Sequence, residues 1–592
     1  MTLEQTLQTQ ISQALSELFS IQVPSEEVLL QATRKDFEGS HTFVTFQIAK
    51  QVRKSPVEVG QQLGDYLQQK GTAVSRFNVV QGFLNLVLSD AVWIELFKSI
   101  QANTSYGFQP ANGQKVMVEY SSPNTNKPLH LGHLRNNFLG YSIAQILKAN
   151  GYEVMKTNIV NDRGIHICKS MLAYQKFGNG ETPESSNTKG DKLVGQYYVE
   201  FDKRYKAEIA ELKATGISEE EAEKQAPLMK EAQQMLVKWE QGDSETVALW
   251  KKMNGWVYAG FDVTYKRMGV DFDKFYYESN TYLLGKGIVN EGLEKGIFFK
   301  KENGSVWIDL TDLGLDEKLL LRGDGTSVYI TQDLGLADLK HTDFPMDKSV
   351  YVVGNEQDYH FKVLFSILKK LGRPYSDGLY HLSYGMVDLP SGKMKSREGT
   401  VVDADDLMNE MVETAEERSK ALSKVAEFPE EERTQLFNML GLGALKYFLL
   451  KVDPVKRMLF NPEESIDLHG HTATFIQYTH ARISTILRKS QEFILVDIPG
   501  LYTLHEAEKD LVILLSEFPN VIKDAGNKYA PSTIANYCYE MAKSYNRFFD
   551  LCSIFKADTP EQMSFRVALS AEVGKVIKKG MNLLGIQVPD RM

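Results

Sequence analysis

The chain has 592 residues, of which 43% are hydrophobic and 24% are charged, and its formal net charge is −10 at pH 7. A chain of this length exceeds what one hydrophobic core supports, so we expect three or four domains of ordinary soluble, globular composition. No apolar run approaches the length of a membrane span, and the acidic N-terminus lacks the basic start and the cleavage site of a signal peptide. We therefore expect neither a membrane span nor a signal peptide.

Cysteine use and charge distribution limit the compartment and the partners. The three cysteines, Cys168, Cys538 and Cys552, form no CxxC pair, which favours a reducing cytoplasm and argues against a structural zinc site. A metal pair of His166 and Cys168 lacks further ligands and is not predicted. A net negative charge is unusual for a nucleic-acid binder. However, residues 467–592 contain 14 basic and 14 acidic residues, so this part can present a basic face to RNA.

The first part of the chain, residues 1–110, predicts a small α/β domain. This prediction rests on an apolar stripe at helical spacing, a helix start at Ser55-Pro56 and an alternating apolar run. Gly82 indicates a β-bulge or a close backbone approach. The expected elements are a helix over 2–19, a strand over 36–48, a helix over 55–69 and a strand over 77–88.

A strand, a broken loop and a helix follow in residues 115–151. Val116, Val118 and Tyr120 alternate with more polar residues, which predicts a strand with one apolar and one mixed face. Prolines and asparagines then break the strand, and apolar residues at helical spacing predict the helix. In many α/β proteins the free N–H groups at such a helix start bind an anion.

The first turn of this helix carries His130-Leu131-Gly132-His133. The two imidazoles lie on one helical face, and Gly132 removes a side chain where a flat or phosphorylated ligand could approach. Taken alone, this short motif fits a pair of surface histidines as well as it fits a binding site.

Residues 153–407 continue the α/β pattern around an insertion. The strand expected over 153–160 ends in Asn161-Asp162-Arg163-Gly164, at the edge of the sheet where such folds bind ligands. Residues 186–290 predict a mostly helical insertion with solvated charged faces and aromatic residues in the core. The later elements are expected to be strands over 305–310, 327–331, 349–353 and 380–387 and a helix over 361–371.

A Gly- and Lys-rich loop, LPSGKMKSREGT, occupies residues 389–400 and contains Lys393-Met394-Lys395-Ser396-Arg397. When ATP activates a carboxylate, negative charge builds on the departing pyrophosphate. Cations on a flexible loop can meet that charge and then release the product. By itself this loop is one basic turn among many.

Taken together, these segments resemble the class I aminoacyl-tRNA synthetases. Ser121-Ser122-Pro123-Asn124, Lys127-Pro128 and the His-Leu-Gly-His turn resemble the first signature of that class, and the leading Ser-Ser-Pro-Asn is similar to the arginyl enzymes. The loop at Lys393 resembles the second, KMSKS signature. Ser396 stands where the second Lys of that signature is usual, and the resemblance implies that Lys127 supplies the missing cation, as arginyl enzymes often show.

The resemblance implies ATP as a co-substrate that arrives with Mg²⁺, without a protein cage for the ion and without a tightly bound cofactor. The implied catalytic residues, which stabilise the phosphates, are His130, His133, Lys127 and Lys393. The implied ATP-binding residues are His130, Gly132, His133, Gly385, Met386, Lys393, Lys395 and Ser396.

The amino-acid substrate is also implied by the resemblance. The arginine-binding residues carried over from the arginyl enzymes are Glu119, Asn124, Tyr329, Asp333 and Gln357. A fixed carboxylate can accept two hydrogen bonds from a planar guanidinium, which a lysine ammonium cannot reproduce. Without the resemblance, Asp333 also fits the N-cap of a helix over 334–339.

The last part, residues 426–592, predicts a helical bundle, with helices over 429–452 and 470–493. Residues 472–482 and 582–592 resemble the start and the end of the anticodon-binding bundle of arginyl enzymes. RNA recognition favours bases stacked on aromatic rings, with basic side chains on the backbone. Most aromatic residues here belong to the core, and the candidates for tRNA contact are Tyr478, Arg482 and Tyr545.

These observations favour a multidomain α/β protein. A Rossmann-like parallel-sheet catalytic domain with a helical insertion, over 111–425, lies between a small N-terminal α/β domain and an all-α C-terminal bundle. The resemblance to arginyl enzymes implies that the N-terminal domain contacts tRNA. The predicted function is ATP-dependent activation of L-arginine and its transfer to tRNA(Arg), by a cytoplasmic monomer. Two alternatives are a synthetase of the same class for another amino acid and a non-catalytic RNA-binding relative.

Overall fold

The computed structural model describes residues 3–34, 36–71, 73–388, 402–420, 428–467, 470–498 and 502–592. The chain divides into two compact units, which we describe separately. The first comprises Met1–Tyr106, Arg482–Phe518 and Met541–Val576, and the second comprises Gly107–Ala481, Pro519–Glu540 and Ile577–Met592. Within the described ranges, no helix has the length and apolar character needed to cross a membrane.

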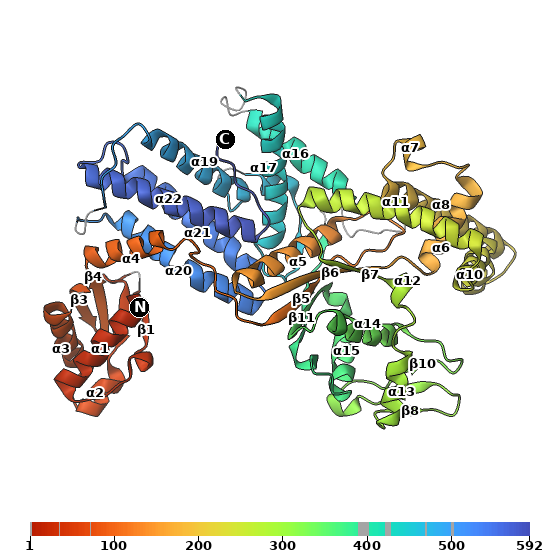
Figure 1. The fold of residues 1–592 in the computed structure, drawn as a ribbon, viewed down its shortest axis with the longest axis horizontal. Coiled ribbons are helices and arrows are strands. Elements are labelled where there is room, and N and C mark those ends of the chain that lie inside the picture. Colours follow the sequence, from red (N-terminus) through yellow and green to blue (C-terminus); the bar gives the residue numbers. More distant parts are fainter. Residues whose placement is uncertain are drawn as a thin grey trace. The chain divides into compact units, whose positions relative to one another are not determined.

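The N-terminal part of the first unit is a four-stranded antiparallel sheet, in the order β1-β2-β4-β3, with helices (Figure 1). The Ser55 hydroxyl accepts a hydrogen bond of 3.1 Å from the Glu58 N–H, so the predicted cap of α3 is confirmed. The elements are α1 (Leu3–Phe19), β1 (Leu30–Ala32), β2 (His41–Val44), α2 (Phe46–Val52), α3 (Pro56–Lys70), β3 (Val74–Val80), β4 (Phe83–Leu88) and α4 (Asp90–Ala102).

Two of the strand predictions in this part were wrong. The strand expected over 36–48 ends at Val44, because α2 begins at Phe46. The strand expected over 77–88 is a hairpin in which Val80 pairs with Phe83. Gln81 and Gly82 both have positive φ, 51° and 90°, as a two-residue hairpin turn that follows the twist of its strands requires.

The second unit is organised around a five-stranded sheet in the order β12-β11-β5-β6-β7, in which every neighbouring pair is parallel. Its strands are β5 (Lys115–Glu119), β6 (Glu153–Val160), β7 (Lys274–Tyr277), β11 (Lys348–Gly354) and β12 (Leu379–Tyr384). The strand order reverses between β5 and β11, and the carboxyl ends of such a pair are where open α/β sheets bind ligands.

Helices cover both faces of this sheet. Helix α5 (Leu131–Ala149) packs against β5, β6 and β11, whereas α14 (Tyr329–Asp343) and α15 (Asp358–Lys370) lie on the other side (Figure 1). Met117, on the face of β5 away from α5, packs in the same core cluster as Leu334 of α14 and Phe361 of α15. Both faces of β5 are covered, including the mixed face that carries Met117 and Glu119, because a parallel strand between two helical layers is buried on both sides.

Close contact between α5 and the end of β5 depends on Gly140. A Cβ atom at this position would lie 2.3 Å from the Cβ of Tyr120, a fully buried residue. We expect Gly140→Ala to lower the free energy of unfolding by about 1–3 kcal/mol, because the helix must move away from the strand. The matched control is Gly255→Ala in the exposed middle of α11 (Ser244–Met268), where nothing lies within 4 Å.

Urea unfolding followed by circular dichroism measures both variants. Gly255→Ala should be neutral or stabilising by up to about 1 kcal/mol, since Ala is the better helix former. Equal stabilities for the two variants would show that α5 can adjust to the added methyl group.

The insertion is helical, as predicted, and a small antiparallel sheet follows it, in the order β10-β9-β8. Helices α6 (Ile165–Phe177) and α7 (Pro183–Ser186) lead into the insertion. The helices that follow are α8 (Gly190–Ala214), α9 (Glu219–Gln225), α10 (Pro227–Glu240), α11, α12 (Glu278–Thr281) and α13 (Lys286–Glu294). The strands are β8 (Phe298–Lys300), β9 (Val306–Ile308) and β10 (Lys318–Leu321).

The strand expected over 327–331 does not form, because α14 begins at Tyr329. The residues buried here, Ile330, Leu334 and Ala337, have helical spacing. Packing against the sheet therefore favours a helix for this segment. The strand expected over 380–387 is also split: β12 ends at Tyr384, and β13 (Val387–Asp388) pairs with β14 (Met458–Leu459).

The C-terminal part of the chain is helical, as predicted. Its helices are α16 (Ala404–Lys420), α17 (Glu430–Leu450), α18 (Pro462–Ser465), α19 (Ala473–Ser490), α20 (Glu506–Lys528), α21 (Pro531–Leu551) and α22 (Pro560–Leu583).

Candidate active site

The candidate site lies at the carboxyl end of β5, where the chain turns into α5. His130 is the N-cap of α5, and its Nδ1 accepts a hydrogen bond of 3.1 Å from the Gly132 N–H. His133 Nδ1 accepts one of 3.2 Å from the His130 N–H, and the two ring centroids are 4.0 Å apart. Because both Nδ1 atoms act as acceptors, each neutral ring carries its proton on Nε2, where it can be donated to a ligand.

Both imidazoles are held neutral. Burial lowers the pKa of His130 to about 3, and the neighbouring Lys127 ammonium acts in the same direction. Burial also lowers the pKa of His133 well below its ordinary value, with further contributions from His130 and Lys127. The structure thus brings Lys127 and the two histidines together, as predicted, with the cationic charge on the lysine rather than on the rings.

A titration tests this assignment. We expect His130 and His133 to remain neutral Nε2–H tautomers from pH 8 down to about pH 5, because their pKa values are depressed below the ordinary 6.5. Imidazole ¹⁵N shifts of ¹⁵N-histidine-labelled protein measure the tautomers, and single His→Asn variants assign the signals. Protonation of either ring near pH 6.5 would contradict the hydrogen-bond pattern.

The sign of the stability change follows from the same depressed pKa values. Below pH 6.5 the unfolded chain binds protons at these histidines that the folded chain refuses. They therefore destabilise the fold progressively as the pH falls from about 6.5 towards their folded values.

The chain that follows residue 401 lies against the histidine turn. The Leu131 N–H donates to the Val402 carbonyl at 3.3 Å, and the Ala404 N–H donates to the Leu129 carbonyl at 2.9 Å. The predicted ATP-binding residues Lys393, Lys395 and Ser396 lie outside the described residues.

The two other predicted ATP-binding residues, Gly385 and Met386, lie in the turn between β12 and β13. The Gly385 N–H donates to the Pro454 carbonyl at 2.9 Å, and a Cβ at Gly385 would lie 2.6 Å from the backbone nitrogen of Arg457. Met386 lies beside the end of β11, since its Sδ would be 3.7 Å from a Cβ at Gly354. Both residues therefore lie near the carboxyl end of the sheet.

Of the predicted arginine-binding residues, three are exposed, Glu119 is buried and Asp333 is partly exposed. Asn124, Tyr329 and Gln357 are exposed, and Tyr329 is 78% accessible. Glu119 is buried at the end of β5 and forms an ion pair with Lys340 of α14. Burial raises the pKa of Glu119 and the Lys340 ammonium opposes that rise. The charge of Asp333 raises this pKa further, so the carboxylates of Glu119 and Asp333 interact electrostatically.

Asp333 lies inside α14, on its second turn, so the alternative reading as a helix N-cap was wrong. Its Oδ2 is 2.7 Å from Nε2 of His360, at the start of α15. The carboxylate is only partly exposed. The contact with His360 fixes the orientation of the Asp333 carboxylate, which can then accept hydrogen bonds from a planar cation.

Sequence reasoning missed two residues near Asp333, His360 and Glu278, and named Asp162 only as part of the loop at the ligand-binding edge. Glu278, at the start of α12, is partly buried. Burial raises the pKa of Glu278, Arg163 opposes that rise, and the charges of Asp162 and Asp333 raise the pKa further. Asp162 is 1% exposed and accepts hydrogen bonds from the Ser279 N–H and hydroxyl and from the Tyr258 hydroxyl. Asp162 thereby fixes the start of α12, a role that its place after β6 indicated only in outline.

The candidates for tRNA contact differ in exposure. Tyr478 is 38% exposed. Arg482 donates to the Asn546 side chain at 2.6 Å and lies over the Phe549 ring. Tyr545 is fully buried, and its hydroxyl donates to Ser570 at 3.0 Å, so this ring belongs to the core rather than to a base-stacking surface.

The described residues contain no group of three or more His, Cys, Asp or Glu side chains arranged to hold a metal ion. His166 Nδ1 is instead 3.0 Å from the Tyr198 hydroxyl, and Cys168 is buried.

Comparison with known families covers nearly the whole chain. The family described as tRNA synthetases class I (R), catalytic domain, matches residues 96–461. The Arginyl tRNA synthetase N terminal domain matches residues 5–88, and the DALR anticodon binding domain matches residues 476–592.

Named relatives agree with these matches over their full length. The arginine–tRNA ligase of Bacteroides thetaiotaomicron is 58% identical over 597 residues, and that of Flavobacterium psychrophilum is 54% identical over 605, with all of each chain covered. Among solved structures, Thermus thermophilus arginyl-tRNA synthetase superposes with a TM-score of 0.78 at 24% identity, with both chains fully covered. The Plasmodium falciparum enzyme gives 0.75 at 19%, covering 100% of this chain and 99% of that one. At these identities the two structures support the fold.

Proposed function

Because the chain belongs to the arginyl-tRNA synthetase family of class I, we propose that the His130 turn and the carboxylates around Asp333 form its active site. The protein is an ATP-dependent ligase that joins arginine to tRNA(Arg) in protein synthesis. The residue roles below are our assignment, and the observation that carries it is the pair of neutral imidazoles whose Nε2–H groups are left for a ligand.

In the first step, an oxygen of the arginine carboxylate attacks the α-phosphorus of ATP. The bond from that phosphorus to the β-phosphate oxygen breaks, which gives arginyl-adenylate and pyrophosphate. No side-chain nucleophile is required, so the protein acts by positioning and by electrostatic stabilisation. In the second step, a terminal ribose hydroxyl of tRNA attacks the activated carbonyl, and AMP leaves.

We assign the phosphate contacts to His130 and His133, with cationic charge from Lys127. Donors fixed in place before the reaction need no reorganisation as charge develops, which makes them effective in a site that excludes water. Hydrogen bonds from backbone groups already fix both rings through Nδ1. The assignment of Lys393, Lys395 and Ser396 rests on the resemblance of their loop to the KMSKS signature.

We assign the substrate guanidinium to Asp333. Glu119 is already paired with Lys340, so we assign it to holding α14 against β5. Glu278 is a second carboxylate coupled to Asp333 and can accept from the same planar cation. Asn124, Tyr329 and Gln357, which are exposed, are assigned to the remaining polar groups of arginine.

Several broader assignments also belong to this proposal. We propose that Mg²⁺ accompanies ATP and that the protein works in the cytoplasm, where its three buried cysteines stay as thiols. A monomeric state and the division at residues 110 and 425 remain predictions.

An aminoacylation assay tests the proposal. Purified protein is incubated with ATP, Mg²⁺, matching tRNA and each of the twenty amino acids in turn. We expect esterification of arginine alone. Charging of a different amino acid would support another synthetase of the class, and no charging would support a non-catalytic RNA-binding relative.

A further inference from the structure

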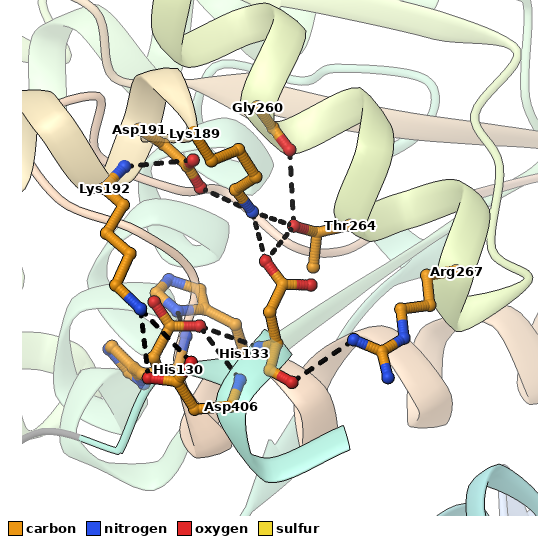
Figure 2. Close-up of polar contacts among 11 residues, drawn as sticks. His130, His133, Lys189, Asp191, Lys192, Gly260, Thr264, Arg267 and Asp406 are labelled. Atoms are coloured by element: carbon orange, nitrogen blue, oxygen red, sulfur yellow. Dashed lines mark hydrogen bonds and ion pairs between the residues drawn. The ribbon is translucent and has the colours of Figure 1, made fainter. Parts of the chain in front are cut away.

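A cluster of charged side chains joins the insertion helices to the chain beside the histidine turn. Lys189 precedes α8 and Thr264 lies on α11 (Figure 2). Asp405 lies in the first turn of α16. None of these residues was a candidate from the sequence. The cluster lies next to His130 and His133, as the close-up shows.

Lys189 joins three elements through one ammonium group. Its Nζ is 3.1 Å from Oδ2 of Asp191 and 2.6 Å from the Thr264 hydroxyl, and it also forms an ion pair with Asp405. Thr264 in turn donates to Asp405 at 3.0 Å. The ammonium therefore donates hydrogen bonds to Thr264 and Asp405 and forms an ion pair with Asp191, and each of these partners lies on a different helix.

Helices α8 and α11 pack tightly against each other at Asp191 and Gly260. The Asp191 side chain is 0% exposed, and a Cβ at Gly260 of α11 would lie 2.4 Å from its Oδ1. Burial raises the pKa of Asp191 to about 6, and Lys189 opposes that rise. Burial alone would lower the pKa of Lys189, but Asp191 and Asp405 outweigh it and raise that pKa, so the ammonium stays charged.

The start of α16 connects this cluster to the site. Asp403 accepts from the Asp405 N–H at 2.7 Å, which caps the helix. Arg267 of α11 donates to the Asp405 carbonyl at 3.3 Å. Val402, just before the helix, and Ala404, its first residue, hydrogen-bond to Leu131 and Leu129, on either side of His130.

We propose that Lys189 and Asp405 are positioning residues, which tie α8 and α11 to the start of α16 and through it set the place of the His130 imidazole. They touch no reacting atom. The inference rests on the proposed role of His130, and it predicts that the insertion affects arginine activation through this contact.

The main test is Asp405→Asn. This change weakens the ion pair with Lys189 but leaves the Lys189–Asp191 pair, the Asp403 cap and the backbone ladder in place. The matched control is the neighbouring change Asp406→Asn, whose carboxylate pairs only with an exposed lysine, Lys192, at 3.2 Å among the contacts drawn (Figure 2).

Arginine-dependent exchange of pyrophosphate into ATP, with matching tRNA present, gives the rates. We expect Asp405→Asn to lower kcat by roughly tenfold or more with the KM for arginine nearly unchanged, since a misplaced donor weakens the transition state rather than amino-acid binding. Asp406→Asn should stay within about twofold of the unchanged protein, as exposed ion pairs contribute little. Equal rates for the two variants would overturn the proposal.

A double variant shows whether the effect passes through the imidazole. In a background of His130→Asn, Asp405→Asn should cause no further loss of kcat, because residues that act as a unit are not additive. A further loss equal to that in the unchanged background would also overturn the proposal. If the unchanged protein shows no exchange at all, the proposed function has failed instead.

Discussion

Replacing His130 with Asn is expected to reduce kcat for arginine activation by about 10²–10³, the usual effect of removing one fixed donor to developing charge. Asn is among the best N-cap residues, so its side-chain oxygen can replace Nδ1 as the acceptor for the Gly132 N–H. The start of α5 should therefore remain folded, while the Nε2–H donor is lost. Pyrophosphate exchange measures the rate, and thermal unfolding checks the fold.

His130→Gln is the matched control for this prediction. Its amide nitrogen reaches about as far as Nε2, so part of the lost rate should return although the cap is poorer. A His130→Asn variant as active as the unchanged protein would remove the imidazole from the reaction. If His130→Asn showed the expected loss of rate together with a melting temperature much lower than that of the unchanged protein, His130 would act mainly as a helix cap.

Replacing Asp333 with Asn is expected to lower kcat/KM for arginine by on the order of 10³, because the substrate guanidinium would lose its charged partner. The change removes one negative charge and keeps the shape of the side chain. Citrulline, which has a neutral urea in place of the guanidinium, provides the sharpest readout. The ratio of kcat/KM for arginine to that for citrulline should fall by a similar factor.

Asp338→Asn is the control on the same helix. Asp338 accepts from Arg373 Nε at 2.9 Å and pairs with its guanidinium, so its neutralisation should lower stability but leave the preference for arginine intact. If Asp333→Asn charged arginine as well as the unchanged protein, another carboxylate would have to bind the guanidinium. Glu278 would then be the next candidate, since its charge is coupled to the same site.

Local structure at the site was predictable because local residues specify it. The strand β5 and the helix α5 were predicted from apolar spacing, and the turn with His130 and His133 was recognised from adjacent residues. The Ser55 cap of α3 likewise depends on a hydrogen bond between residues three apart. Short-range bonds of this kind follow from neighbours in the chain.

The errors arose where packing chose between two local preferences. The run over 77–88 has strand character throughout, and the turn at Gln81 and Gly82 is set by positive φ angles that the pattern does not reveal. Residues 327–331 fit a strand by composition, but α14 begins at Tyr329 because a helical face is buried there.

The sequence by itself determined the family and the two imidazoles on one helical turn, since these depend on residues that are close in the chain. Only the tertiary structure decided the partners of the charged groups. Glu119 pairs with Lys340, Asp333 with His360, and Lys189 with Asp405, across 221, 27 and 216 residues of chain. Buried or partly buried charges need a partner because water no longer solvates them, and folding, not proximity in sequence, selects which partner that is.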